Sequence, residues 1–86
     1  MKKMTKEQLG ISSVPFESEG FTPKYMAKDF CGTWFCYEQK PSLENGEWIT
    51  RGSPYYEIGV DDEEESNTPP NLRWVQPEES LFEIKD

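Results

Sequence analysis

The chain has 86 residues, of which 34 % are hydrophobic and 14 % aromatic, and its formal net charge is −8. This length predicts one domain of modest stability whose core depends on aromatic side chains. The acidity disfavours binding to free nucleic acid or to an anionic membrane, and the lack of histidine removes the commonest general base and metal ligand.

Charge is distributed unevenly along the chain. Residues 1–40 carry a net charge of +1, whereas residues 41–86 carry −9. Such a distribution attracts a basic partner to the second half. The same acidity can serve only to keep the protein soluble, and the sequence leaves both interpretations open. The second half contains a run of acidic residues: Asp61, Asp62, Glu63, Glu64 and Glu65.

The N-terminus and the cysteines indicate a cytoplasmic protein. Lys6 and Glu7 stand where a signal peptide needs an apolar run, and the longest apolar run covers only residues 34–37. Cys31 and Cys36 are five residues apart. In an extended segment, five residues separate the two Cα atoms by roughly 16 Å. A disulfide requires a Cα separation of about 4.4–6.8 Å, so we expect two reduced thiols.

Residues 1–21 are predicted to form a helical turn and a loop. Thr5 and Gln8 have the spacing of a capping box, and Gly10 would end the turn that they begin. Serine, proline and glycine in the following stretch favour a loop. Three apolar residues of this loop are expected to pack against the core: Ile11, Val14 and Phe16.

A helix is predicted over residues 22–30. Thr22 can act as its N-cap, and Pro23 suits the first helical position. Met26 and Phe30 are one helical turn apart and would share the face that covers the sheet.

The predicted sheet lies within residues 33–60. Strands are expected at 33–40, 47–51 and 55–60 because aromatic and β-branched residues concentrate there. Asn45-Gly46 is typical of a tight hairpin, but that register would place Glu44 opposite Glu47. We therefore expect a longer loop that spans residues 41–46.

The remaining chain is predicted as an acidic, proline-rich loop at 61–71 followed by a strand and tail at 72–86, in which the strand covers residues 72–76. Residues 77–80 begin either one helical turn or a bent final strand. The fold predicted is a small α+β domain, residues 1–86, in which a curved antiparallel sheet of three to four strands packs against one or two short helices. The residues expected to supply much of the core are Trp34, Phe35, Tyr37, Trp48, Ile58 and Trp74.

The sequence contains little that points to catalysis or to cofactors. It has neither a P-loop nor the glycine pattern of dinucleotide sites. The acidic run places carboxylates at alternate positions, as an EF-hand loop does, but Ser66 and Leu72 stand where that loop needs glycine and glutamate. We therefore expect no enzyme activity, no cofactor and no metal site.

These observations indicate a non-catalytic acidic protein-binding module that occupies a basic surface of another protein, including one that otherwise binds nucleic acid. In size, acidity and lack of catalytic equipment the chain resembles the small early proteins of bacteriophages, many of which bind and inhibit a host protein. The alternative is a structural or assembly module whose aromatic sheet contacts another copy or a virion component. A monomer or homodimer is expected. The predicted partner-binding residues are Asp61, Asp62, Glu63, Glu64, Glu65, Glu57, Tyr55, Glu78 and Glu79.

Overall fold

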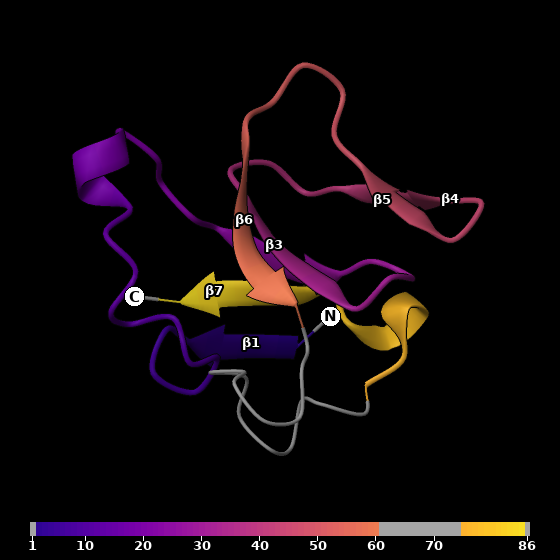
Figure 1. Ribbon diagram of the computed structural model, residues 1–86, viewed down its shortest axis with the longest axis horizontal. Helices are drawn as coiled ribbons and strands as arrows, with labels where there is room; N and C mark the ends of the chain where they lie inside the picture. The colour runs from indigo at the N-terminus through magenta and orange to yellow at the C-terminus, as the bar shows by residue number, and fades with distance from the viewer. Residues whose placement is uncertain (1, 61–74, 86) are drawn as a thin grey trace.

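The chain folds into a five-stranded mixed sheet and a separate two-stranded hairpin (Figure 1). The structure is a computed structural model that describes residues 2–60 and 75–85. Within those residues it contains no α-helix and only two 3-10 turns, η1 (Glu17–Glu19) and η3 (Pro77–Glu79), so the predicted α+β class is wrong. The strands are β1 (Lys2–Thr5), β2 (Tyr25–Lys28), β3 (Thr33–Tyr37), β4 (Ser42–Glu44), β5 (Glu47–Ile49), β6 (Tyr55–Val60) and β7 (Phe82–Lys85).

The two ends of the chain meet in the larger sheet. Its strand order is β1-β7-β2-β3-β6, and β1 runs parallel to β7 while the other neighbours are antiparallel (Figure 1). Lys2 pairs with Phe82 and Thr5 with Lys85. The prediction of an antiparallel sheet with three to four strands therefore missed β1, which needs a partner from the opposite end of the chain, and it assigned the residues of β2 to a helix.

The segment predicted as a helix at residues 22–30 forms β2 and the start of a hairpin turn. Gly32 has a φ of 87°, and its N–H donates to the carbonyl of Asp29 over 3.1 Å. A type I turn followed by a left-handed glycine is a common hairpin connection. Asp29 strengthens it, because its Oδ1 accepts the N–H groups of Cys31 at 2.9 Å and Thr33 at 3.1 Å. This turn outweighs the weak helix signals that precede it.

The capping-box pattern at the N-terminus forms as predicted, although it closes a single turn and no helix follows. The N–H of Thr5 donates to Gln8 Oε1 over 2.9 Å, and the N–H of Gln8 donates to Thr5 Oγ1 over 3.1 Å. Gly10 then adopts a φ of 75°. The turn redirects the chain after β1, so that the following loop passes over one face of the sheet.

The hairpin at β4 and β5 has the tight register that the sequence analysis rejected. Asn45 and Gly46 both have positive φ angles, 52° and 81°, as a type I′ turn requires. Glu44 does lie opposite Glu47. Arg51 offsets this repulsion, because its Nη2 contacts the two carboxylate oxygens of Glu44 at 3.0 and 2.9 Å. Pro41 precedes the ladder and so does not interrupt it.

β6 has the bounds that the sequence predicted, and it carries a bulge. The pairing with β3 passes from Trp34 opposite Gly59 to Phe35 opposite Glu57, which leaves Ile58 as the extra residue. Gly59 has a φ of 147°, a conformation that side chains rarely adopt. The bulge bends the edge of the sheet.

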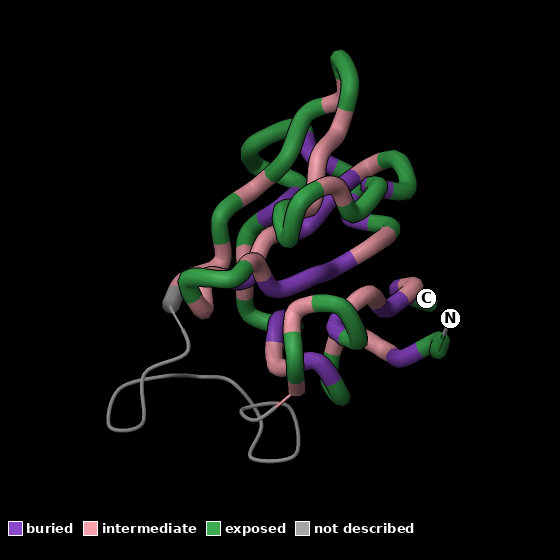
Figure 2. The backbone as a smooth tube through the Cα atoms, turned by 90° about the vertical axis from the view of Figure 1, so that its right-hand side faces the viewer, coloured by how far each residue is buried: buried purple, intermediate pink, exposed green. Residues whose placement is uncertain are grey.

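The core lies on one face of the sheet, beneath the loop formed by residues 6–21, and buried residues concentrate in the central strands (Figure 2). Ile11 and Phe16 are buried and Val14 packs against the core, as predicted. Of the six residues predicted for the core, Trp34 and Tyr37 are buried, Phe35, Trp48 and Ile58 are half-buried, and Trp74 lies outside the described residues. The residues that the prediction omitted include Met4, Leu9, Phe21, Met26, Phe82 and Ile84.

The C-terminal segment contains both structures between which the sequence left a choice. η3 is one turn, and β7 follows it. Ser80, fully buried between them, accepts the N–H of Lys28 at 2.8 Å, and its hydroxyl proton faces the carbonyls of Pro77 and Lys28. A serine side chain thus takes the place of a strand residue beside Lys28. Of the strand predicted at residues 72–76, only Val75 and Gln76 are described, and neither is in a strand.

Candidate functional site

Two of the predicted partner-binding residues lie on the sheet face opposite the core. Tyr55 pairs with Tyr37 and Glu57 pairs with Phe35, so these four side chains share one face. Tyr55 is 64 % exposed, and Glu57 is also exposed. Phe35 meets the ring of Tyr55 edge-on, with 5.7 Å between ring centroids. The structure therefore brings Tyr55 and Glu57 together on an aromatic surface, which we call the outer face.

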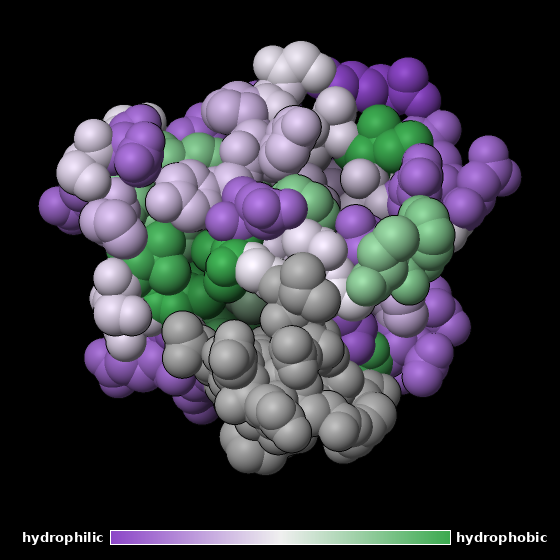
Figure 3. Space-filling model, viewed as in Figure 1, coloured by the Kyte–Doolittle hydropathy of each residue, from purple (hydrophilic) through white to green (hydrophobic). Residues whose placement is uncertain are grey.

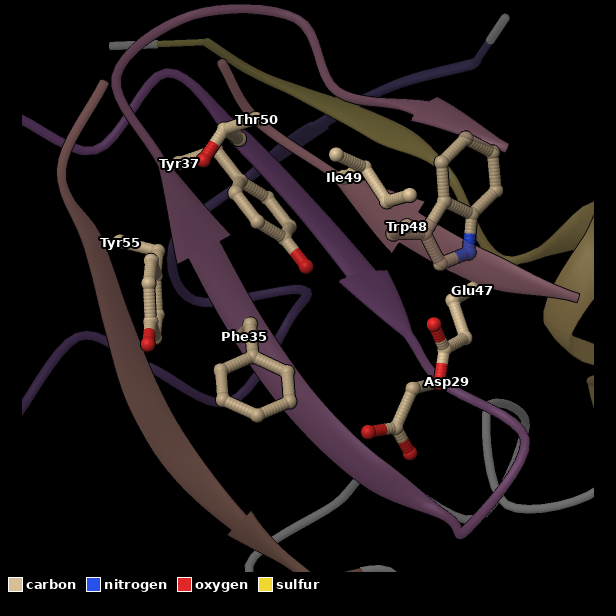
Figure 4. A pocket seen from close by; sticks show the side chains of 8 residues that line it. All are labelled: Asp29, Phe35, Tyr37, Glu47, Trp48, Ile49, Thr50 and Tyr55. Carbon is tan, nitrogen blue, oxygen red and sulfur yellow. The ribbon is translucent and has the colours of Figure 1, made fainter. Parts of the chain in front are cut away.

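The outer face forms the floor of a groove, and β5 with the residue that follows it forms one wall (Figure 4). The cavity has a volume of about 320 Å³. Figure 4 shows the Tyr37 hydroxyl pointing into it between Phe35 and β5. The described residues that line it are Asp29, Phe35, Tyr37, Tyr55 and residues 47–50.

A hydrogen bond holds the wall of the groove in place. Trp48 Nε1 donates to the carbonyl of Pro77 over 3.1 Å, which joins the β4–β5 hairpin to η3. Glu78 and Glu79, both predicted to contact a partner, are exposed on this turn. They are therefore attached to the groove's wall through Trp48, but they do not themselves line the groove.

The carboxylates that do line the groove, Asp29 and Glu47, were not among the predicted site residues. Figure 4 shows the two carboxylates at the same end of the groove. A signal for each was present in the sequence: Asp29 begins an Asp-x-x-Gly turn, and Glu47 directly follows Asn45-Gly46. Their proximity depends on the approach of the hairpin to the β2–β3 turn, and neither motif specifies that approach.

The environment of Tyr37 reflects both burial and negative charge. The pKa of its hydroxyl is raised from 10.0 to about 12, mainly by burial and in smaller part by the nearby Asp29 carboxylate. A negative charge that disfavours a phenolate also favours a cation at the same place. The groove therefore combines an aromatic floor with a negative potential.

The acidic run Asp61, Asp62, Glu63, Glu64 and Glu65 lies outside the described residues, so its predicted role in binding stays a prediction. Since β6 ends at Val60, the run begins where a strand of the outer face ends.

The two cysteines have contrasting environments. Cys31 is exposed in the β2–β3 turn, whereas Cys36 is buried on the core side of β3, and both are free thiols. Burial raises the pKa of Cys36 from 9.0 to about 12, which leaves it in the unreactive thiol form at neutral pH.

Neither a metal cluster nor a membrane-spanning helix is found in the described part of the chain. Among residues 2–60 and 75–85, no three side chains of the types that bind metals gather into a possible site. The same residues contain no helix of the length and apolarity that crossing a bilayer requires.

Comparison of the chain with protein-family models, with curated proteins and with solved structures found no match.

Proposed function

We propose that the protein is a non-catalytic acidic protein-binding module whose outer face and acidic run occupy a basic surface of another protein. The observation that carries this proposal is the position of Tyr55 and Glu57. Both are exposed beside an aromatic groove that contains two further carboxylates. Tyrosine and tryptophan are common anchors of protein interfaces, and acidic groups around them select a basic partner.

The distribution of apolar surface supports a polar partner. On the face visible in Figure 3, apolar residues form separate patches divided by hydrophilic ones. Interfaces of this kind gain specificity and association rate from charge, while a few aromatic anchors supply most of the contact energy. A small acidic protein of this type suits the role of an inhibitor, as in the small early proteins of bacteriophages that it resembles.

The alternative function is an assembly module that pairs through the edge of its sheet. β6 is an edge strand of the described sheet and has six residues, enough to pair with another chain. The bulge at Ile58 disfavours this function, because an irregular edge pairs poorly with a second strand.

The proposal can be tested by capture from a cell lysate followed by kinetics. The immobilised protein is expected to retain a basic partner, which is identified by mass spectrometry and then purified. Two variants separate the contributions of the surfaces: one neutralises the five acidic residues 61–65 to Asn and Gln, which changes the net charge from −8 to −3, and the other combines Tyr55→Ser with Glu57→Gln.

The kinetic effects of the two variants should differ. Loss of the acidic run is expected to reduce the association rate about tenfold at low salt, with a smaller effect as ionic strength rises. Loss of Tyr55 and Glu57 is expected to act mainly on the dissociation rate. If neither variant changes binding, or if the captured partner is not basic, the proposal is wrong. Concentration-dependent dimers in sedimentation would favour the assembly function instead.

A further inference from the structure

The groove on the outer face has the size and lining of a site for one long side chain. Its volume of about 320 Å³ is at the lower end of ligand pockets. Phe35, Tyr37 and Tyr55 present aromatic surface along its floor, and Trp48 adds an indole to its wall (Figure 4). Such surfaces attract cations as well as apolar groups, because the faces of aromatic rings are electron-rich.

The charges at one end of the groove are negative and close together. Asp29 and Glu47 both line it, and Glu57 lies opposite Phe35 on the same face. Two nearby carboxylates repel each other unless a cation lies between or beside them.

Two basic residues adjacent in sequence to residues that line the groove have contacts elsewhere. Arg51 binds the carboxylate of Glu44 on the hairpin, at 2.9 Å. Lys28 extends over the ring of Trp34 on the core side of the sheet, with its Nζ 5.6 Å from the ring centroid. Among the described residues that line the groove, none is a lysine or an arginine. The negative charge of the groove is therefore available to a cation from outside.

The groove is also fixed in shape before any ligand arrives. The Trp48 indole is held by its bond to Pro77, and Asp29 is held by the two backbone N–H groups that its Oδ1 accepts. Phe35 contacts both Tyr37 and Tyr55, at centroid distances of 6.4 and 5.7 Å. A preformed site loses little conformational entropy on binding.

We infer that this groove binds an arginine side chain of a protein partner, an assignment that rests on the proposed function and names the group that the outer face recognises. A guanidinium group is planar, stacks on aromatic rings and donates two parallel hydrogen bonds to a carboxylate. Asp29 and Glu47 accept N–H groups of the guanidinium while the Phe35 ring stacks on its plane, and the Tyr55 ring, which lies at 78° to that of Phe35, contacts its edge. Lysine fits the site less well, since its ammonium group is more strongly hydrated and does not stack.

The inference is tested with peptides that differ in one side chain. The probes are acetyl-Gly-Gly-Xaa-Gly-Gly-amide with arginine, lysine or citrulline at Xaa; citrulline keeps the shape of arginine without its charge. In ¹H–¹⁵N NMR spectra, the arginine peptide is expected to shift the Trp48 Nε1–H signal and the Phe35 and Glu47 amides, with millimolar affinity. Lysine should bind several-fold more weakly, and citrulline should cause no shift. Equal shifts with citrulline, or no shift at about 10 mM arginine peptide, would overturn the inference.

Matched variants locate the site. Glu47→Gln removes one carboxylate of the groove, and Glu17→Gln removes an exposed carboxylate on η1, so both change the net charge equally. Glu47→Gln should weaken the arginine peptide about tenfold, whereas Glu17→Gln should leave its affinity unchanged. Phe35→Leu keeps an apolar side chain but removes the ring, and it should also weaken binding severalfold. Equal effects of Glu47→Gln and Glu17→Gln would show general charge attraction and overturn the assignment.

The peptide experiment and the capture experiment can fail independently, so failure of the arginine site can be distinguished from failure of the proposed function. If a captured basic partner depends on Tyr55 and Glu57 but the arginine peptide leaves the groove unchanged, the function stands and the arginine site is wrong. If the arginine peptide binds in the groove while no basic partner depends on the outer face, the site stands as a binding site for arginine and the proposed function is wrong.

Discussion

The two faces of β3 carry different kinds of chemistry in a single short strand. On the inner face, Trp34 and Cys36 are almost completely buried against the N-terminal loop and β7. On the outer face, Phe35 is half-buried and Tyr37 directs its hydroxyl into the groove (Figure 4). Since side chains alternate along a strand, four consecutive residues divide between the core and the candidate site.

The comparison shows how a small domain can keep its stability separate from its binding surface. The inner face requires close packing, and its residues come from both ends of the chain. Among the described residues, the β4–β5 hairpin lies over part of the outer face. Changes to the inner face should therefore alter folding, whereas changes to the exposed part of the outer face should alter binding alone.

The largest expected difference between the faces is in the free energy of unfolding. Trp34→Ala should cost about 3–5 kcal/mol, because it leaves a large cavity in the core. Tyr55→Ala should cost less than about 1 kcal/mol, because that side chain is 64 % exposed. Urea denaturation of both variants measures the two costs. Equal losses of stability would show that the outer face is also part of the core.

A second prediction concerns alkaline pH. The folded protein raises the pKa of Cys36 from 9.0 to about 12 and that of Tyr37 from 10.0 to about 12. Below pH 9 both groups are neutral in the folded and the unfolded state, so they do not reduce the free energy of unfolding. As pH rises from 9 towards 12, the unfolded chain ionises first, and this lowers the free energy of unfolding. The free energy of unfolding should therefore fall with pH over this interval, because the unfolded chain gives up these two protons at lower pH than the folded protein does.

Thermal melts between pH 7 and pH 12 measure this loss, and single variants assign it. In the plot of stability against pH, Cys36→Ala should remove the decline that begins near pH 9. Tyr37→Phe should remove the decline that begins near pH 10. Cys31→Ala is the control, because it removes an exposed thiol in the β2–β3 turn and leaves the core intact. A profile that is unchanged in both test variants would contradict the assignment.

The third prediction concerns Ser80, whose side chain bonds to the backbone of Lys28 where a neighbouring strand would otherwise do so. Ser80→Ala should cost about 1–3 kcal/mol, because it leaves the buried N–H of Lys28 without its acceptor. Ser18→Ala is the matched control, since its hydroxyl bonds to the Pro15 carbonyl at an exposed site. That change should cost less than about 0.5 kcal/mol. Chemical denaturation compares them, and an equal cost would show that the Ser80 bonds contribute little.

The smallest effect is expected from modification of the exposed thiol. Iodoacetamide should label Cys31 in the native protein while Cys36 stays protected, because Cys36 is buried and its pKa is raised. The label on Cys31 should change the free energy of unfolding by less than about 0.5 kcal/mol. Mass spectrometry measures the rate at which each cysteine is labelled in native and in urea-unfolded samples. Equal labelling rates in the native protein would contradict the burial of the inner face.

Several local features of this protein were determined by short stretches of sequence. The reciprocal hydrogen bonds of Thr5 and Gln8 depend only on residues three apart, and the bounds of β6 follow from a six-residue run between a turn and the acidic residues. The Asn45-Gly46 turn also forms, even though it places two glutamates opposite each other. The sequence analysis did not pair Arg51 with Glu44, which is seven residues away, and this contact offsets the repulsion.

Features that join distant segments were decided only by the tertiary structure. The residues at 25–28 can begin a helix or a strand, and they form a strand because β3 and β7 supply hydrogen bonds on both sides. β1 and β7 pair across almost the whole chain, and no local pattern specifies such a partner. The groove likewise depends on the hairpin lying beside the outer face, where the Trp48–Pro77 bond holds it. Local sequence thus determined turns and the bounds of β6, whereas β3 and β5 end at Tyr37 and Ile49, earlier than the predicted strands at 33–40 and 47–51. Contacts between distant segments decided the sheet, the core and the place where Asp29 meets Glu47.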